Sequence, residues 1–223
     1  MVELACLAGT LAAYGLALGL RRLVRSPVAN PTLVAVLAVG AVLGLTGLDY
    51  ESYEEATAPI SFLLGPAVVA LAVPLHCERE WILEHARALL LGAVLGAGAA
   101  MLLGFVAASL LALNDDFALA LTTRTATTPI SIAIADGLEG APALSAVLSI
   151  TSGIFGATFG SAVLDRVGVT LPGARGVAVG LTAHGIGTER MLDESRVAGA
   201  SSSVGMGLGG LAVALVVPGL WGS

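Results

Sequence analysis

The stretch that decides the fold is Arg124-Thr125-Ala126-Thr127-Thr128-Pro129-Ile130-Ser131. It lies inside a long apolar segment, residues 117–135, whereas almost every other charge lies between such segments. A guanidinium at membrane depth is costly, so it tends to face a partner or a water-filled cavity. Pro129 lacks a backbone donor and frees a carbonyl one turn earlier, which lipid tolerates only where protein, hydroxyls or cavity water satisfy it. We interpret this stretch as a broken or re-entrant helix that lines an anion site.

The composition predicts an all-α polytopic membrane protein that forms a single membrane domain over residues 1–223. The chain is 57% hydrophobic and 12% charged, with a mean hydropathy of +0.94, which excludes an ordinary soluble domain. Its net charge of -6 comes from the loops and does not indicate a nucleic-acid partner. The two cysteines, Cys6 and Cys77, suggest no disulfide framework. No basic region precedes the first apolar run, so this run is expected to be a retained helix rather than a signal peptide.

Six apolar runs are long enough to cross a hydrocarbon core of about 30 Å at about 1.5 Å per helical residue. They are residues 3–20, 32–48, 59–75, 88–113, 142–164 and 201–220. Two further apolar segments, residues 117–135 and 176–188, contain Pro or several Gly. The sequence therefore predicts about six full transmembrane helices plus two broken or re-entrant segments.

The distribution of arginines favours the re-entrant alternative. The ten basic residues are all Arg, and cytoplasmic loops of membrane proteins are rich in basic residues. If each interrupted segment leaves the membrane on the side from which it entered, all the arginines except Arg124 fall in cytoplasmic loops. A helix that crosses the membrane in two halves stays an alternative for residues 117–135. The absence of lysine suggests a GC-rich prokaryote, so we expect the cytoplasmic membrane of a bacterium or archaeon.

One internal echo suggests a repeat. Residues 56–61 nearly match residues 126–131, which would divide the chain into a first half, 1–116, and a second half, 117–223, that carries the site motifs. Duplicated halves with interrupted helices recur in transporters. A chance match within Ala- and Val-rich sequence is the alternative.

Several strings, in order along the chain, resemble motifs of the LrgB/CidB family of bacterial membrane proteins. They are residues 65–75, Thr127-Thr128-Pro129-Ile130, Thr151-x-Gly153-Ile154-Phe155-Gly156, Ala174-Arg175-Gly176, His184-Gly185-Ile186-Gly187-Thr188 and Met206-Gly207-Leu208-x-Gly210. The resemblance covers nearly the whole chain. Two positions depart from it: Arg124 stands where the family usually has Lys, and His76 stands where Tyr is usual.

The resemblance implies two lines of function. Members of the family have been described as antiholin-like regulators of murein hydrolase export and cell lysis, which act with a small LrgA/CidA-type membrane partner. A plant plastid relative is a glycolate/glycerate transporter, and some bacterial pairs are associated with pyruvate movement. We therefore expect a transporter of small monocarboxylates such as glycolate, glycerate or pyruvate, with the antiholin-like regulator as the alternative. A homodimer is compatible with either function.

The first group of candidate substrate-binding residues lies at the predicted break and consists of Arg124, Thr127, Thr128, Pro129 and Ser131. Arg124 is suited to pairing with a carboxylate through its bidentate fork. Its alternative roles are an ion pair with an acidic residue after the segment, Asp136 or Glu139, and snorkelling toward the outer face. The hydroxyls are suited to binding substrate, or else to bonding the helix carbonyls that Pro129 frees.

The second group of candidates is His184, Gly185, Gly187 and Thr188. The glycines let the backbone unwind and expose N–H groups that hold an anion, and His184 could donate to the substrate or carry a coupled proton. The alternative is a helix-packing pair of glycines with a satisfied histidine. No metal-ligand spacing, P-loop or hydrolase motif occurs. We therefore expect no enzyme activity, no metal and no cofactor.

Overall fold

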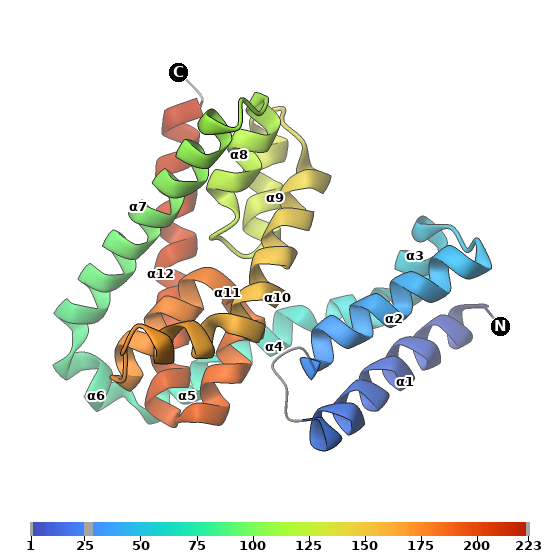
Figure 1. Cartoon of the computed structure of the whole chain (residues 1–223), viewed down its shortest axis with the longest axis horizontal. Helices are drawn as coiled ribbons and strands as arrows, with labels where there is room; N and C mark the ends of the chain where they lie inside the picture. Colours follow the sequence, from blue (N-terminus) through green and yellow to red (C-terminus); the bar gives the residue numbers. More distant parts are fainter. Residues whose placement is uncertain (1, 25–28, 222–223) are drawn as a thin grey trace. The chain divides into compact units, whose positions relative to one another are not determined.

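The computed structural model describes residues 2–24 and 29–221, and these ranges fold almost entirely into helices (Figure 1). The helices are α1 (Val2–Leu23), α2 (Pro31–Thr46), α3 (Tyr50–Phe62), α4 (Leu64–Ala70), α5 (Ala72–Cys77), α6 (Arg79–Glu84), α7 (Ala86–Leu110), α8 (Asp115–Thr123), α9 (Thr128–Gly137), α10 (Pro142–Arg166), α11 (Pro172–Glu194) and α12 (Arg196–Trp221). The chain divides into two compact units, residues 1–70 and 71–223. Helices α5–α7 thus belong to the unit that carries the site motifs.

The first unit begins its helices with side-chain caps. The Asn30 side chain accepts hydrogen bonds from the first turn of α2, and Pro31 occupies the first helical position, where its missing N–H costs nothing. Asp49 caps α3 in the same way. As a result α3 begins at Tyr50, well before residue 59, where the sequence placed the start of the third span. The helical run is interrupted between α3 and α4, just before Gly65 and Pro66.

Helices α1, α2 and α3 line an open, apolar cavity of about 530 Å³ within the first unit. Thr10 of α1 and Tyr53 of α3 meet at its wall, where their hydroxyls lie 2.9 Å apart. None of the predicted site residues lines this cavity.

Long apolar helices confirm the expected all-α polytopic membrane fold. Within the described residues, five helical runs are long and apolar enough to cross a membrane: α1, the run Tyr50–Cys77 formed by α3–α5, α7, α10 and α12. The apolar helix α2 is shorter, with 16 residues. These six elements correspond to the six predicted spans. The two matching segments of the internal echo differ in conformation. Residues 56–61 lie within α3, whereas residues 126–131 lead from a break into α9.

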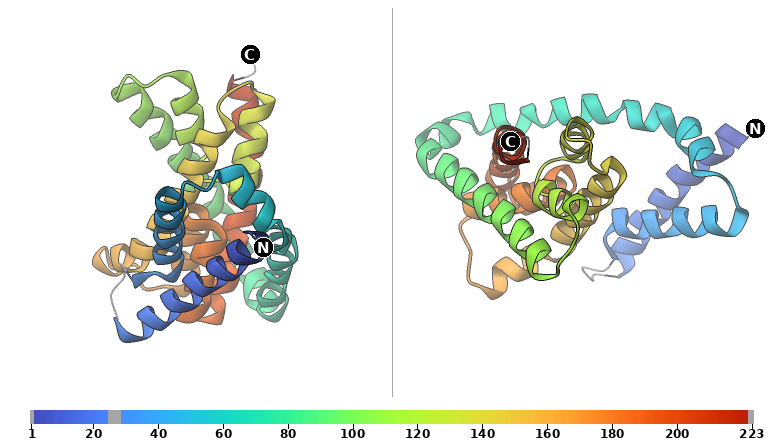
Figure 2. Two further views of the ribbon diagram at one scale, coloured as in Figure 1. Left: turned by 90° about the vertical axis from the view of Figure 1, so that its right-hand side faces the viewer. Right: turned by 90° about the horizontal axis from the view of Figure 1, so that it is seen from above.

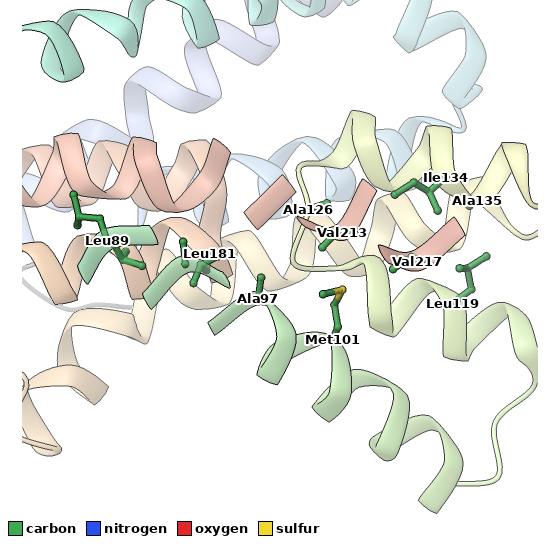
Figure 3. Close-up of a cluster of buried hydrophobic side chains, with 12 residues drawn as sticks. Leu89, Ala97, Met101, Leu119, Ala126, Ile134, Ala135, Leu181, Val213 and Val217 are labelled. Carbon is green, nitrogen blue, oxygen red and sulfur yellow. The ribbon is translucent and has the colours of Figure 1, made fainter. Parts of the chain in front are cut away.

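The core of the second unit joins α7, α8, α9, α11 and α12 (Figure 3). Small and medium side chains fill it; Ala97 of α7, Ala126 at the break and Val213 of α12 are fully buried. Met101 and Leu119 pack into the same cluster. This core surrounds the two interrupted segments, so their short arms are held by packing rather than by their own length.

Glycines bring α11 and α12 into backbone contact. A side chain at Gly176 would run into the carbonyl of Ala198, and one at Gly180 would run into that of Ser202. From the other helix, a side chain at Gly205 would meet the backbone of Val177. Close approach through small residues is the way helices associate in membranes. The face of α12 that carries Gly205 and Gly209 is therefore packed against α11.

Candidate functional site

Helices α8 and α9 form a helical hairpin, called hairpin 1 below together with residues 124–127 between them. Helix α8 ends at Thr123 and α9 begins at Thr128. Beyond the end of α9, Gly140 lies beside the start of α8, because a methyl group added there would lie 3.6 Å from the Asp116 carboxylate. The chain therefore leaves hairpin 1 close to where it entered (Figure 2).

Helix α11 is also folded back on itself, and the folded segment is called hairpin 2. His184 has φ 49° and ψ −134°, which interrupts the helix. Arg175 and Glu194 are 19 residues apart, yet Nε of Arg175 donates to Oε2 of Glu194 at 2.9 Å. In a straight helix these residues would be separated by about 28 Å. The sequence placed the break within residues 184–188, and the turn is at His184.

The two hairpins open toward opposite ends of α12 and meet at their tips. Hairpin 1 begins just after α7, whose Phe105 ring packs edge-on against Trp221 at the C-terminal end of α12. Hairpin 2 ends at Glu194, next to the N-terminal end of α12 (Figure 1). At the tips, the backbone of Thr125 lies against the imidazole of His184. The structure thus brings the two segments that carry the predicted groups together, through Thr125 and His184.

Arg124 ends the first arm of hairpin 1 without an acidic partner. Its side chain is half-buried, and its guanidinium donates to the Leu121 carbonyl at 3.1 Å beside Gly104 of α7. Within residues 2–24 and 29–221 no carboxylate forms an ion pair with it. Asp136 and Glu139, the alternative partners, are exposed. A partly buried positive charge without a counter-charge is a candidate binding site for an anion.

Two buried polar atoms at the tips have no hydrogen-bond partner in the described part of the chain. They are Oγ1 of Thr125 and Nε2 of His184, and the two residues are 2% and 7% exposed. Buried polar groups are nearly always paired, so an unpaired one marks a functional group or a missing ligand. The positive φ of His184 costs about 1–3 kcal/mol, a kind of strain that clusters at ligand sites.

The other predicted site residues play several roles. Ser131 is fully buried and donates to the Thr123 carbonyl at 2.7 Å, which is the structural alternative left open for it. Thr188 is also fully buried, and its hydroxyl bonds to the His184 carbonyl and to Ser202. Thr127 and Thr128 are half-buried at the start of α9, while Pro129 and Gly185 are exposed and Gly187 packs within hairpin 2.

Three polar residues at the tips were not among the predicted site residues. Thr125 lay within the quoted stretch but was passed over in favour of the hydroxyls after it. Ser149 and Ser152 belong to α10 and donate to carbonyls of the two tips. Their signal in the sequence is a pair of serines three residues apart beside the Thr151-x-Gly153 string, which alone does not show what they face.

An ionic cluster closes the open end of hairpin 2. The Arg175 guanidinium forms two hydrogen bonds to Glu194 and one to Asp165, and Ser161 donates to Glu194 at 2.5 Å. Partial burial by itself raises the pKa of the Glu194 carboxyl, but the hydrogen bonds from Arg175 and Ser161 outweigh it and leave this pKa below its ordinary value of 4.5. The cluster therefore ties both arms of hairpin 2 to the end of α10.

The lowered pKa of Glu194 predicts an acid-labile contribution to stability. The contribution is fully present above the ordinary pKa of 4.5 and is lost as the pH falls through the lower pKa of the folded state. We expect the thermal midpoint of purified protein to fall more steeply below pH 4.5 in the wild type than in Glu194→Gln. Glu139→Gln, which changes an exposed acid between α9 and α10, should follow the wild type. Parallel curves for the wild type and Glu194→Gln would contradict the prediction.

Comparison with known proteins identifies the family. A model of the LrgB-like family matches residues 10–222. An uncharacterized protein of Haemophilus influenzae is 31% identical over 209 residues, which cover 94% of this chain and 90% of that protein. The uncharacterized protein YxaC of Bacillus subtilis is 32% identical over 199 residues, or 89% and 86% of the two chains. No solved structure matches. The sequence resemblance is thus confirmed, and the chain belongs to the LrgB-like family.

Proposed function

We propose that this chain carries small monocarboxylates across a membrane by alternating access, with the substrate held where the two hairpin tips meet. The observation that carries the proposal is the chemistry of that meeting point. Thr125 and His184 carry unpaired polar atoms there. Arg124, the residue before Thr125, has a guanidinium without an acidic partner among the described residues, which bonds to the Leu121 carbonyl beside Gly104 of α7. A monocarboxylate would supply the missing negative charge and the missing hydrogen-bond partners.

Each group suits one part of such a substrate. The Arg124 guanidinium presents a planar fork of donors that matches a carboxylate. The Thr125 hydroxyl both donates and accepts, and a neutral imidazole does one or the other at Nε2 according to its tautomer. These two groups suit a hydroxyl or carbonyl oxygen next to the carboxylate. The substrate class is thus that of glycolate, glycerate and pyruvate, which the family resemblance also implies.

The lengths of the hairpin arms support a re-entrant arrangement. Helices α8 and α9 have 9 and 10 residues, so each arm is about 15 Å long. The kink at His184 divides the 23 residues of α11 into arms of similar length. Two hairpins of this depth that enter from opposite faces would meet near the middle of a hydrocarbon core of about 30 Å. Broken helices that hold an ion or substrate at mid-membrane are a recurring transporter plan.

The charges around the hairpins support one orientation. Hairpin 2 opens among arginines, including Arg166, Arg175, Arg190 and Arg196, whereas Asp115, Asp116, Asp136 and Glu139 surround the open end of hairpin 1. Basic residues favour the cytoplasmic side. We therefore place the open end of hairpin 2 in the cytoplasm and the chain in the cytoplasmic membrane of a prokaryote.

The alternative is an antiholin-like regulator that acts with a small LrgA/CidA-type partner and transports nothing. A scaffold of this kind would bury Arg124 in a fixed ion pair, whereas a carrier needs its charge available to a ligand. The absence of an acidic partner for Arg124 among the described residues favours the carrier. We assign the carrier no catalytic reaction.

Uptake into proteoliposomes that contain the purified chain tests the proposal. We expect saturable uptake of labelled glycolate, glycerate or pyruvate, with competition from unlabelled monocarboxylates. Glycolamide, a neutral analogue of glycolate, should not compete because it cannot pair with Arg124. Equal competition by the amide would overturn the anion site.

Absence of uptake in sealed, correctly oriented vesicles would reject the carrier for this chain alone. The assay would then be repeated with a small LrgA/CidA-type partner in the same vesicles. Uptake only with the partner would indicate a two-chain carrier. Absence of uptake in both preparations would leave the regulatory function.

A further inference from the structure

Helix α10 contacts the tips of both hairpins through a single turn. Its Ser149 donates to the carbonyl of Ala126 in hairpin 1 at 2.7 Å. Its Ser152, three residues further along and on the same helix face, donates to the carbonyl of Thr182 in hairpin 2 at 3.0 Å. Next to it, a methyl group added at Gly153 would lie 3.6 Å from the Ala183 carbonyl and 3.9 Å from Nδ1 of His184.

The carbonyls that receive these bonds lie at the two helix breaks. Ala126 lies between α8 and α9, and its carbonyl accepts from Ser149 at 2.7 Å and more distantly from Ser131 at 3.5 Å. Thr182 lies two residues before the kink at His184, and its carbonyl accepts from Ser152. An unpaired carbonyl in hydrocarbon costs several kcal/mol. The breaks therefore depend on donors from a neighbouring element.

We propose that Ser149 and Ser152 are positioning residues that set the separation of the two tips and so the geometry of the substrate site. Both donors stand on one rigid helical turn, which fixes Ala126 relative to Thr182. Thr125, next to Ala126, and His184, two residues after Thr182, carry the unpaired polar atoms. The kinetic consequence of this inference rests on the carrier function proposed above, whereas its structural consequence does not.

The two serines should differ in importance because their surroundings differ. Ser149 is fully buried, and its oxygen also lies 3.4 Å from that of Ser131, which bonds to Thr123 at the other side of the break. Ser152 is only half-buried. Water can take over a hydrogen bond where it has access. Loss of the Ser149 hydroxyl should therefore disturb tip 1 more than loss of the Ser152 hydroxyl disturbs tip 2.

Transport kinetics test the positioning role. Per molecule of folded protein, we expect Ser149→Ala to raise KM about tenfold, because the Ala126 carbonyl is left with the longer 3.5 Å contact from Ser131 Oγ and the tip moves. Ser149→Cys, whose thiol is a weak donor of similar shape, should fall between the wild type and Ser149→Ala. Ser152→Ala should raise KM less than Ser149→Ala. The matched control is Ser109→Ala on α7, because Ser109 is exposed and bonds only to its own helix at Phe105. A merely structural role would lower the yield or thermal midpoint of Ser149→Ala and leave KM unchanged, which would overturn the inference.

A distance measurement tests the same inference without transport. Spin labels at Ile132→Cys and Glu189→Cys, both exposed and near the tips, report the separation of the hairpins in a Cys6→Ser, Cys77→Ser background. We expect a narrow distance distribution with Ser149 in place and a broader or shifted one in Ser149→Ala, with Ser109→Ala unchanged. An unchanged distribution in Ser149→Ala would overturn the positioning role. A changed distribution in a protein that takes up no carboxylate would uphold it and reject the carrier alone.

Discussion

Arg124→Ala is expected to reduce carboxylate uptake, measured as Vmax/KM in proteoliposomes, by about 10- to 100-fold. The estimate follows from about 1.5–3 kcal/mol for a hydrogen bond to a charged group and about 1.4 kcal/mol per factor of ten. The folded protein should survive the change, because the guanidinium forms one hydrogen bond to its own helix and no ion pair with a described residue. Its loss therefore removes a ligand contact rather than a structural one.

Two variants make this result specific to the site. Arg166→Ala removes the same charge from the exposed last residue of α10 and should leave uptake within about twofold of the wild type, as surface charges contribute little. Arg124→Lys should retain most of the uptake, because it keeps the charge and because the family usually has lysine at this position. Uptake by Arg124→Ala at the wild-type rate would leave a carrier but remove Arg124 from its site.

Gly180→Ala is expected to prevent the second unit from reaching its folded state in good yield. A methyl group here would run into the Ser202 carbonyl oxygen and lie 2.8 Å from the carbonyl carbon. Backbone cannot rotate aside as a side chain can, so α11 and α12 would have to separate. Overpacking of this kind costs about 1–3 kcal/mol or more. The separation would also break the bond between Thr188 and Ser202.

Gly207→Ala is the matched control for that change. Gly207 lies on α12 as well, but nothing stands within 4 Å of a methyl group added there. Alanine is favoured over glycine in a helix, so this variant should be as stable as the wild type or more stable by up to about 1 kcal/mol. The monodisperse fraction in size-exclusion chromatography and the thermal midpoint compare the two. Equal stability of the two variants would contradict the close packing of α11 on α12.

The sequence predicted the fold class and the two interrupted segments because their signals are local. An arginine and a proline inside an apolar run indicate a helix break, whichever segments pack against it. The break is found at residues 124–127. Cap residues such as Asn30 likewise act within their own helix, here at the start of α2. The sequence placed the start of the third span at residue 59, which is too late. The residues before it are acidic and polar, but Asp49 caps the helix, so α3 begins at Tyr50.

The interior of the candidate site depends on contacts between distant segments, which the sequence does not specify. Ser131 was proposed as a substrate ligand, but its hydroxyl bonds to a carbonyl eight residues away across the break. The turn of hairpin 2 falls on His184, which lies beside Gly153 of α10, and the sequence alone does not single out this residue within the segment. Thr125 and Thr127 are alike in sequence, and only the fold places the first against His184.

The short arms of the two hairpins have a consequence for biogenesis. The translocon releases segments of about 20 apolar residues into lipid, a length that α10 and α12 reach and that no single hairpin arm reaches. Hairpin 2 also packs its glycines against α12, which supplies the hydrogen-bond partner of Thr188. Helix α12 is synthesised after hairpin 2. We therefore expect the order of assembly to differ from the order of translation, with the long helices inserted first and the two hairpins folded between them last.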